Sequence, residues 1–168
     1  ITGQSDVNVD QSSIGQTLVN NTNVAQQITY TITPKSGATG NCIGSTFLLT
    51  VTVNPKPSIT TQTQTICSNG TFTILPVNGG NLIVPANTTY TWPAPTNISG
   101  GAISGGAAQL SSVSSISQLL TNNSNSQGVL RYIVTPTSGA TGTCPGAPFN
   151  VEITVSPKPI LTSTLTPT

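Results

Sequence analysis

The sequence predicts an all-β protein, and three observations support this prediction. Thr occurs at 30 of the 168 positions, and together with Val and Ile it is enriched in β-strands. The 16 Gly, 13 Pro and 15 Asn residues mark frequent turns. Short segments in which apolar and polar residues alternate recur along the chain, as expected for strands with one buried face.

The clearest strands are two pairs of alternating segments, at 28–34 and 46–54 and again at 130–136 and 149–156. Three further strands are expected between these pairs, at 71–76, 88–93 and 116–122. Pairs of glycines lie between these segments and indicate turns. About seven short strands in roughly a hundred residues predict a Greek-key β-sandwich of the immunoglobulin-like kind.

An internal repeat sets the organisation of the chain. The segment YTITPKSGATGNCIGSTFLLTVTVNPKP starts at Tyr30 and YIVTPTSGATGTCPGAPFNVEITVSPKP starts at Tyr132, so the offset is 102 residues. The same offset pairs Cys42 with Cys144 without a gap, and it continues backwards to Ile1. One period therefore has the length of a small domain, and the chain does not contain a whole number of periods.

Three parts follow if the Pro-Lys-Pro elements are taken as boundaries. Residues 1–57 are predicted to be the C-terminal part of one immunoglobulin-like repeat, 58–159 a complete repeat, and 160–168 the start of the next. We therefore expect that this chain is a segment of a longer tandem array of repeats. The alternative is one full domain with a divergent partial copy. Proline restricts the backbone, so the boundary elements are expected to act as short, stiff linkers. Their residues are Pro55, Lys56, Pro57, Pro157, Lys158 and Pro159.

The three cysteines suggest disulfides and hence an oxidising compartment. The complete repeat contains Cys67 before one strand and Cys144 before the last strand, and these two are predicted to pair. Cys42 corresponds to Cys144, so its partner is expected upstream of Ile1, outside this window. On the chain-entropy model such a bridge would stabilise the fold by about 4 kcal/mol. The alternative is buried free thiols in a cytosolic protein.

The charge content excludes several classes of function. The chain has four Lys or Arg, three Asp or Glu and no His. A net charge of +1 provides no basic surface for nucleic acid or anionic lipid, and no apolar run reaches the roughly 20 residues that span a bilayer. Without His, and with Glu152 as the only acid of the complete repeat, neither a nucleophile with its base nor a pair of catalytic carboxylates can form. We therefore expect no enzyme activity and no cofactor.

Two side-chain patterns have both a structural and a binding interpretation. Asp6, Asn8 and Asp10 alternate, so on a strand they would share a face and offer oxygens to Ca²⁺. A solvated polar face is preferred, because Ca²⁺ takes about 6 to 8 oxygen ligands. Tyr90 and Trp92 also share a strand face. We expect Trp92 in the core; an exposed Trp92 would instead be able to stack on a sugar.

The segments ICSNGTF and TTYTW, with the two long repeated segments, resemble the PKD-like, immunoglobulin-like tandem repeats of giant secreted surface proteins and adhesins of Bacteroidota-type bacteria. The resemblance covers essentially the whole chain. Its most specific part is the Cys-x-Gly-x-x-Phe element that leads to Pro-Lys-Pro and occurs twice. The resemblance implies export, surface anchoring elsewhere in the protein, and a role as stalk, fibre or adhesin. It implies no catalytic residues.

Two functions from different classes are expected on these grounds. The first is a structural segment of a secreted, extracellular cell-surface stalk or filament. Its partners would be neighbouring repeats or identical chains. A glycan on a surface, or a cell, would be a further binding partner. The second is a short, self-assembling, pilus-like subunit in which a strand from a neighbouring chain completes residues 1–57. A third alternative is a carbohydrate-binding module.

Because titratable groups are so few, we also expect stability to change little between about pH 4 and 9.

Overall fold

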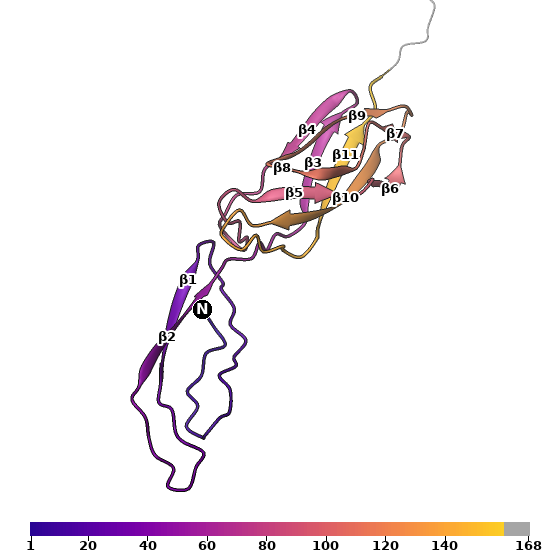
Figure 1. Cartoon of the computed structure of the whole chain (residues 1–168). Helices are drawn as coiled ribbons and strands as arrows, with labels where there is room; N and C mark the ends of the chain where they lie inside the picture. Colours follow the sequence, from indigo (N-terminus) through magenta and orange to yellow (C-terminus); the bar gives the residue numbers. More distant parts are fainter. Residues whose placement is uncertain (160–168) are drawn as a thin grey trace, which may run out of the picture.

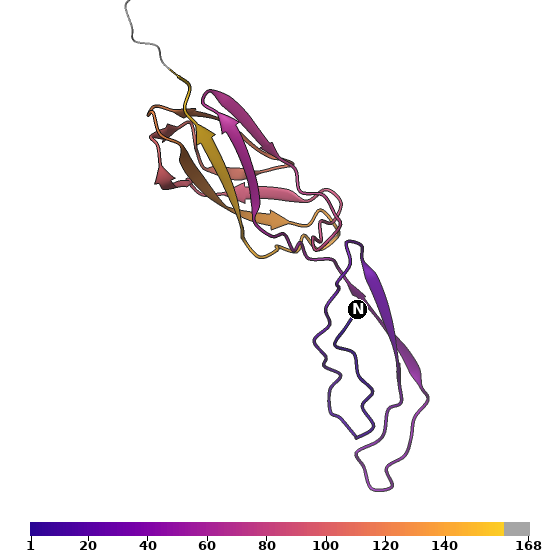
Figure 2. The same ribbon diagram turned by 180° about the vertical axis from the view of Figure 1, so that it is seen from behind.

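The computed structural model describes residues 1–159 and shows eleven β-strands and no α-helix in that range. The all-β prediction is confirmed, and none of the described residues belongs to a helix that could cross a membrane. The predicted start of a further repeat at 160–168 lies outside the described residues. The chain folds into a smaller body, residues 1–57, and a larger body, residues 58–159, which lie end to end (Figure 1, Figure 2).

Nine strands build the larger body and form a β-sandwich. One sheet has the order β3-β11-β10-β5-β8, with β6 also pairing with β10, and the other has the order β4-β9-β7. Side chains from both sheets share a single hydrophobic core. The strands are β3 (Gln62–Cys67), β4 (Gly70–Ile74), β5 (Thr89–Trp92), β6 (Thr96–Gly100), β7 (Ile103–Ser104), β8 (Gln109–Val113), β9 (Ile116–Asn122), β10 (Gly128–Thr137) and β11 (Phe149–Ser156).

The antiparallel pair β10 and β11 forms the centre of the larger sheet, with Leu130 opposite Ile153. Every second residue of both strands is buried, which is the alternation that the sequence showed. On its other edge, β11 pairs with β3 in the parallel direction, so Ser156 lies opposite Cys67. The first and last strands of the larger body therefore end side by side.

Aromatic residues from both sheets meet in the core of the larger body. The ring centroids of Phe72 on β4 and Tyr132 on β10 are 5.3 Å apart. Trp92 on β5 meets Tyr132 edge to face, with 6.2 Å between ring centroids. Only 2% of Trp92 is exposed, so the indole belongs to the core. Such contacts stabilise a domain that has few other large apolar side chains.

The smaller body contains one hairpin, formed by β1 (Gln26–Ile32) and β2 (Phe47–Val53). Ile28 lies opposite Val51, and the whole register of β1 with β2 is that of β10 with β11 shifted by 102 residues. The segment before β1 runs beside the hairpin, and an antiparallel bridge joins Thr2 and Val19 within it. The same shift relates this bridge to the pairing of β7 with β9.

The structure contains strands that the sequence pattern did not predict. β3, β6 and β8 consist mainly of Gln, Thr, Ser, Asn and Gly, so they lack the apolar alternation that marks β10 and β11. Two predicted strands are shorter than expected: β4 ends at Ile74 and β5 ends at Trp92. In both cases a proline follows within two residues, and proline has no N–H with which to continue a ladder.

Candidate functional site

One buried side chain ties the loop after β9 to the last strand of the larger body. Asn122 Nδ2 donates hydrogen bonds to the carbonyl oxygens of Ser126 and Val155, at 2.8 and 2.9 Å. Asn122 Oδ1 accepts hydrogen bonds from the backbone N–H and the hydroxyl of Ser124, at 3.0 and 2.8 Å. Because Asn122 is buried, these bonds satisfy an amide that would otherwise destabilise the fold.

The smaller body repeats this network at positions 102 residues earlier. Asn20 Nδ2 donates hydrogen bonds to the carbonyl oxygens of Val24 and Val53, at 2.7 and 2.8 Å. Asn20 Oδ1 accepts from the backbone N–H and the hydroxyl of Thr22, at 2.9 and 2.7 Å. The smaller body therefore shares this network and the register of its hairpin with residues 103–159, although residues 14–20 do not form the strand that 116–122 form.

A hollow on the smaller body corresponds to the place where Trp92 lies on the larger body. Trp92 Nε1 donates a hydrogen bond of 3.0 Å to the carbonyl oxygen of Ala107, and its ring packs against Tyr132. The positions 102 residues earlier, Ser5 and Tyr30, line the hollow. Its full lining is Gln4, Ser5, Asp6, Ile28, Thr29 and Tyr30. The hollow thus has the surroundings that hold an indole in the larger body.

The hairpin of the smaller body leaves one edge of each strand unpaired within residues 1–159. In the larger body, β10 pairs with β5 and β6, and β11 pairs with β3, in addition to pairing with each other. The corresponding apolar side chains differ in burial. Phe47 is 49% exposed and Phe149 is 5% exposed, whereas Ile14 is 54% exposed and Ile116 is fully buried. Free strand edges beside exposed apolar side chains can be extended by another chain segment.

We call this surface the open face. It consists of the two unpaired strand edges, the hollow beside Tyr30, and the exposed side chains of Ile14 and Phe47. The repeat in the sequence predicts that residues 1–57 are part of a larger unit, but it does not by itself mark these residues as a surface. The signal that could have found them is the repeat itself, because each exposed residue corresponds to a buried one.

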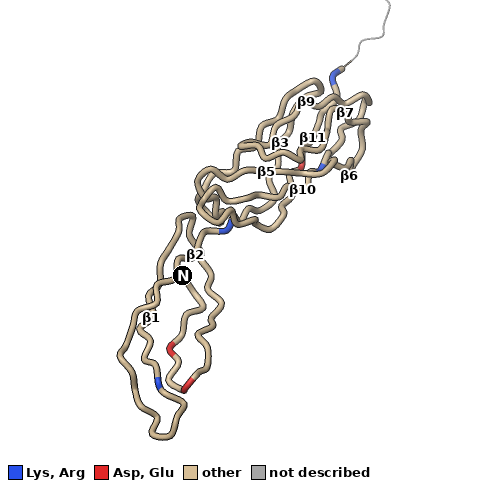
Figure 3. Tube along the Cα trace, in the orientation of Figure 1, with Lys and Arg blue, Asp and Glu red and all other residues tan. Residues whose placement is uncertain are grey.

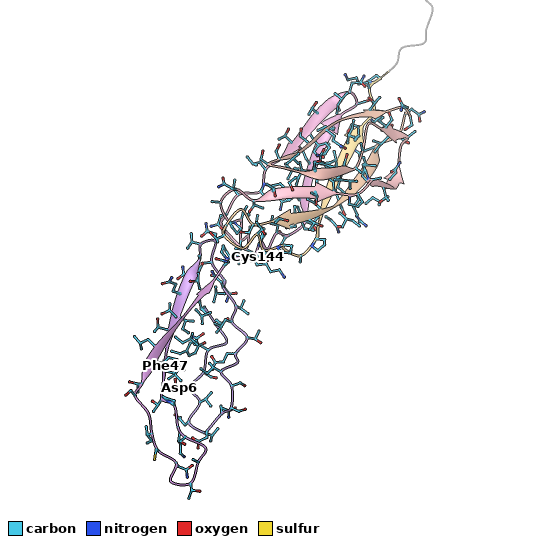
Figure 4. All side chains as sticks on the ribbon, viewed as in Figure 1. Asp6, Phe47 and Cys144 are labelled. Atoms are coloured by element: carbon cyan, nitrogen blue, oxygen red, sulfur yellow. The ribbon has the colours of Figure 1, made fainter. Side chains whose placement is uncertain are left out.

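The predicted pairing of Cys67 with Cys144 is wrong in this structure, in which all three cysteines are free thiols. Cys67 ends β3 and lies opposite Ser156, at the far end of the larger body. Cys144 precedes β11, at the end that faces the smaller body (Figure 4). The eight residues of β11 separate the two ends at about 3.3 Å per residue, whereas the Cα atoms of a disulfide are about 4 to 7 Å apart. The partner predicted for Cys42 lies upstream of Ile1, and this pairing stays a prediction.

The first Pro-Lys-Pro element forms the joint between the two bodies. Pro55 and Pro57 are buried, whereas Lys56 is exposed. Gly146 packs so closely on this element that an added Cβ would lie 2.5 Å from the carbonyl oxygen of Pro57. Beside the joint, a shallow hollow is lined by residues 21–23 of the smaller body and 78–83 of the larger body. Residues of the two bodies therefore lie close together at this joint.

Charged groups do not gather into a catalytic or metal site in the described part of the chain. Figure 3 shows them scattered over both bodies. Arg131 pairs with Glu152 across β10 and β11, and Lys35 pairs with Asp10, both at 2.8 Å. Residues 1–159 contain no group of three His, Cys, Asp or Glu side chains that could hold a metal ion. The segment at 6–10 is not a strand, so the shared face that the Ca²⁺ hypothesis required does not form.

Two tyrosines have a perturbed ionisation. Burial raises the pKa of the phenols of Tyr90 and Tyr132 above the ordinary value for tyrosine. Tyr132 also donates a hydrogen bond of 3.0 Å to Oε1 of Gln118. Both phenols lie in the core, so they contribute to folding rather than to proton transfer at a surface.

The model of a protein family matches both bodies of the chain. A sequence model described as PKD-like domain matches residues 1–57 and again residues 64–159. The two matched stretches end at Pro57 and Pro159, which are the last residues of the two Pro-Lys-Pro elements. A search of curated proteins found no match.

Proposed function

The chain belongs to the PKD-like domain family, and on that basis we propose that it is a segment of a stalk or filament in a large secreted cell-surface protein. Residues 58–159 are one complete domain, 1–57 are the C-terminal part of the preceding domain, and 160–168 begin the next. The Pro-Lys-Pro elements join successive domains into a semi-rigid rod. The rod holds an adhesive or otherwise functional tip away from the cell.

The open face is the observation that carries this proposal. In the larger body, the strands that cover the corresponding surface are β3, β4, β5 and β6, and all of them come from residues 58–101. A preceding segment of the same kind would extend β2 with a parallel strand and β1 with two antiparallel strands. It would also place a tryptophan in the hollow beside Tyr30. One covalent neighbour thus accounts for each feature of the open face.

Binding and catalytic functions have less support. Trp92 lies in the core with its indole N–H bonded to Ala107, so its face is not presented to a sugar. The chain has no His, and its three carboxylic acids are Asp6, Asp10 and Glu152. Two of these acids are paired with a basic side chain. A structural role uses the features that the sequence does have, which are strands, tight turns and prolines.

A second candidate function uses the same open face differently. In a pilus-like fibre, the covering strands come from a neighbouring identical chain instead of from the same chain. The free edges of β1 and β2 are suited to either arrangement, because strand addition requires only backbone hydrogen bonds and matching pockets. The two functions differ in whether the covering segment is covalently continuous with Ile1.

A direct test extends the 168-residue chain at its N-terminus by a copy of residues 58–102. The copy joins Ile1 in the same register in which Ala102 joins Ile103. We expect a monomer in which amide hydrogens of β1 and β2 exchange as slowly as those of β10 and β11, and in which the added tryptophan is shielded from quenchers. The control carries the same added residues in scrambled order. Fast exchange in β1 and β2 of both extended chains would contradict the proposal.

The unextended chain tests the second candidate. If it forms head-to-tail oligomers at increasing concentration, and β1 and β2 become protected in them, strand exchange is favoured. If it stays monomeric while the extended chain gains protection, the covalent array is favoured. The intact mass of the native chain from its source, measured denatured and unreduced, decides independently, because a tandem array requires a mass many times 17.1 kDa.

A further inference from the structure

The two cysteines of the larger body lie at its opposite ends, and each lies next to a joint. Cys67 is exposed at the end of β3, opposite Ser156, and Ser156 directly precedes the second Pro-Lys-Pro element. Cys144 is partly exposed in the loop between β10 and β11, at the end that faces the smaller body (Figure 4). Neither thiol can reach the other, so a bridge within the domain is excluded by this geometry.

The first joint shows what surrounds Cys144 when a domain precedes it. Gly142 has a φ of +96°, and an added Cβ there would lie 2.6 Å from Nδ2 of Asn54 and 3.9 Å from Sγ of Cys144. The thiol and the amide thus flank the same glycine. Asn54 is the last residue before the prolines of the smaller body, and it corresponds to Ser156 at the offset of 102.

This correspondence places a second cysteine at the same joint. In the larger body, Cys67 is the parallel partner of Ser156, so its counterpart in a preceding domain is the parallel partner of Asn54. Neighbouring strands are about 4.8 Å apart, so this cysteine lies next to Asn54, whose amide approaches the same glycine as the thiol of Cys144. The strand that ends beside Asn54 therefore places its cysteine at the same joint as Cys144.

We propose that Cys144 forms an interdomain disulfide with the cysteine of the preceding domain that corresponds to Cys67. This proposal rests on the tandem array of the proposed function. It goes further, because it assigns one interdomain disulfide to each joint. Cys67 then pairs with the following domain, and Cys42 with the domain before its own. Every cysteine in the repeat acquires a partner across a joint, and none pairs within its own domain.

The oxidation is an ordinary thiol–disulfide exchange with a small disulfide such as oxidised glutathione. One thiolate attacks a sulfur of the reagent, forms a mixed disulfide and releases one reduced glutathione. The second thiolate then attacks the protein sulfur of the mixed disulfide and releases the other glutathione. Two protons leave the protein thiols, the two electrons reside in the reduced reagent, and one S–S bond forms. Both positions are accessible to such a reagent, because Cys67 is exposed and Cys144 is partly exposed.

The extended chain, which carries the copy of residues 58–102 before Ile1, contains the required pair. We expect that oxidation with a glutathione buffer links the copied cysteine to Cys144, as read by peptide mapping of the unreduced protein. Cys42→Ser should leave this link intact, and Cys144→Ser should abolish it. A bridge within the domain would give the reverse result, because the copied cysteine would then pair with Cys42.

The outcomes separate this proposal from the one on which it rests. Hydrogen exchange of β1 and β2 reports whether the added segment completes the smaller body, whatever the state of the thiols. If these strands are protected and all thiols remain free, or the link goes to Cys42, the interdomain disulfide is wrong and the tandem array stands. If these strands are not protected, both proposals fail. Both serine variants are at exposed or partly exposed positions, so loss of the link in one alone is not due to misfolding.

Discussion

The side-chain amide of Asn122 donates a hydrogen bond of 2.9 Å to the carbonyl oxygen of Val155 and so connects the loop after β9 to the end of β11. Asn20 makes the same bond to Val53 at 2.8 Å in the smaller body. The smaller body has this bond without the strands that surround it in the larger one. The bond is therefore a local property of the repeated segment and does not depend on a complete sandwich.

Asn122→Ala should lower the free energy of unfolding of the larger body by about 2 to 4 kcal/mol, because it removes several hydrogen bonds and leaves buried backbone groups unpaired. Urea unfolding followed by Trp92 fluorescence measures the effect. Asn125→Ala is the matched control, since Asn125 is exposed in the same loop, and it should change stability by less than about 0.5 kcal/mol. Equal effects of the two substitutions would contradict the role of the Asn122 network.

The sequence identified the strands that alternate and missed those that do not. β10 and β11 place apolar residues at every second position, so period and burial agree. β3 has no such signal, because Gln62 and Gln64 lie on its more buried face. It is identified as a strand by its pairing with β11, which the sequence does not show. The cysteine pairing failed because alternation does not encode strand direction. The parallel pairing of β3 with β11 places Cys67 at the end remote from Cys144.

Phe149 and Phe47 occupy equivalent positions but should respond differently to truncation. Phe149→Ala removes a buried ring from the core and should cost about 3 to 5 kcal/mol. Phe47 is 49% exposed, so Phe47→Ala should cost less than about 1 kcal/mol in the 168-residue chain. Denaturation with urea, read by hydrogen exchange in each hairpin, measures both.

The same pair of substitutions also tests how the open face is covered. In the chain extended by a copy of residues 58–102, Phe47 should become a core residue, and the cost of Phe47→Ala should rise toward that of Phe149→Ala. The chain with the scrambled extension should show no such rise. A cost for Phe47→Ala that is the same in all three chains would show that the added segment does not cover Phe47.

Gly105 is held in a conformation that other residues rarely adopt. Its φ is +95°, and an added Cβ would overlap the carbonyl oxygen of Leu119. Gly105→Ala must therefore displace the backbone beside β9 and should destabilise the larger body by more than about 2 kcal/mol. Gly37→Ala, where an added Cβ meets nothing within 4 Å, should be nearly neutral. Thermal unfolding of the two variants distinguishes these cases, and similar melting temperatures would be inconsistent with the close approach at Gly105.

Stability should be nearly constant from about pH 4 to 9 and should fall above about pH 10, where tyrosine ionises in the unfolded chain. Burial raises the folded-state pKa of Tyr90 and Tyr132 above the unfolded value. A group with a raised folded-state pKa contributes its full stabilisation below the unfolded pKa. That stabilisation is lost as the pH rises, because the unfolded state releases the proton first.

Urea midpoints at several pH values between about 5 and 11 measure this profile, since the midpoint follows the free energy of unfolding when the slope is unchanged. Tyr90→Phe should reduce the fall at alkaline pH, because the unfolded chain then has one phenol fewer to ionise. It should leave the shape of the profile below about pH 9 unchanged. The chain has no His to titrate near neutral pH, so a midpoint that moved strongly between about pH 5 and 8 would contradict the expectation.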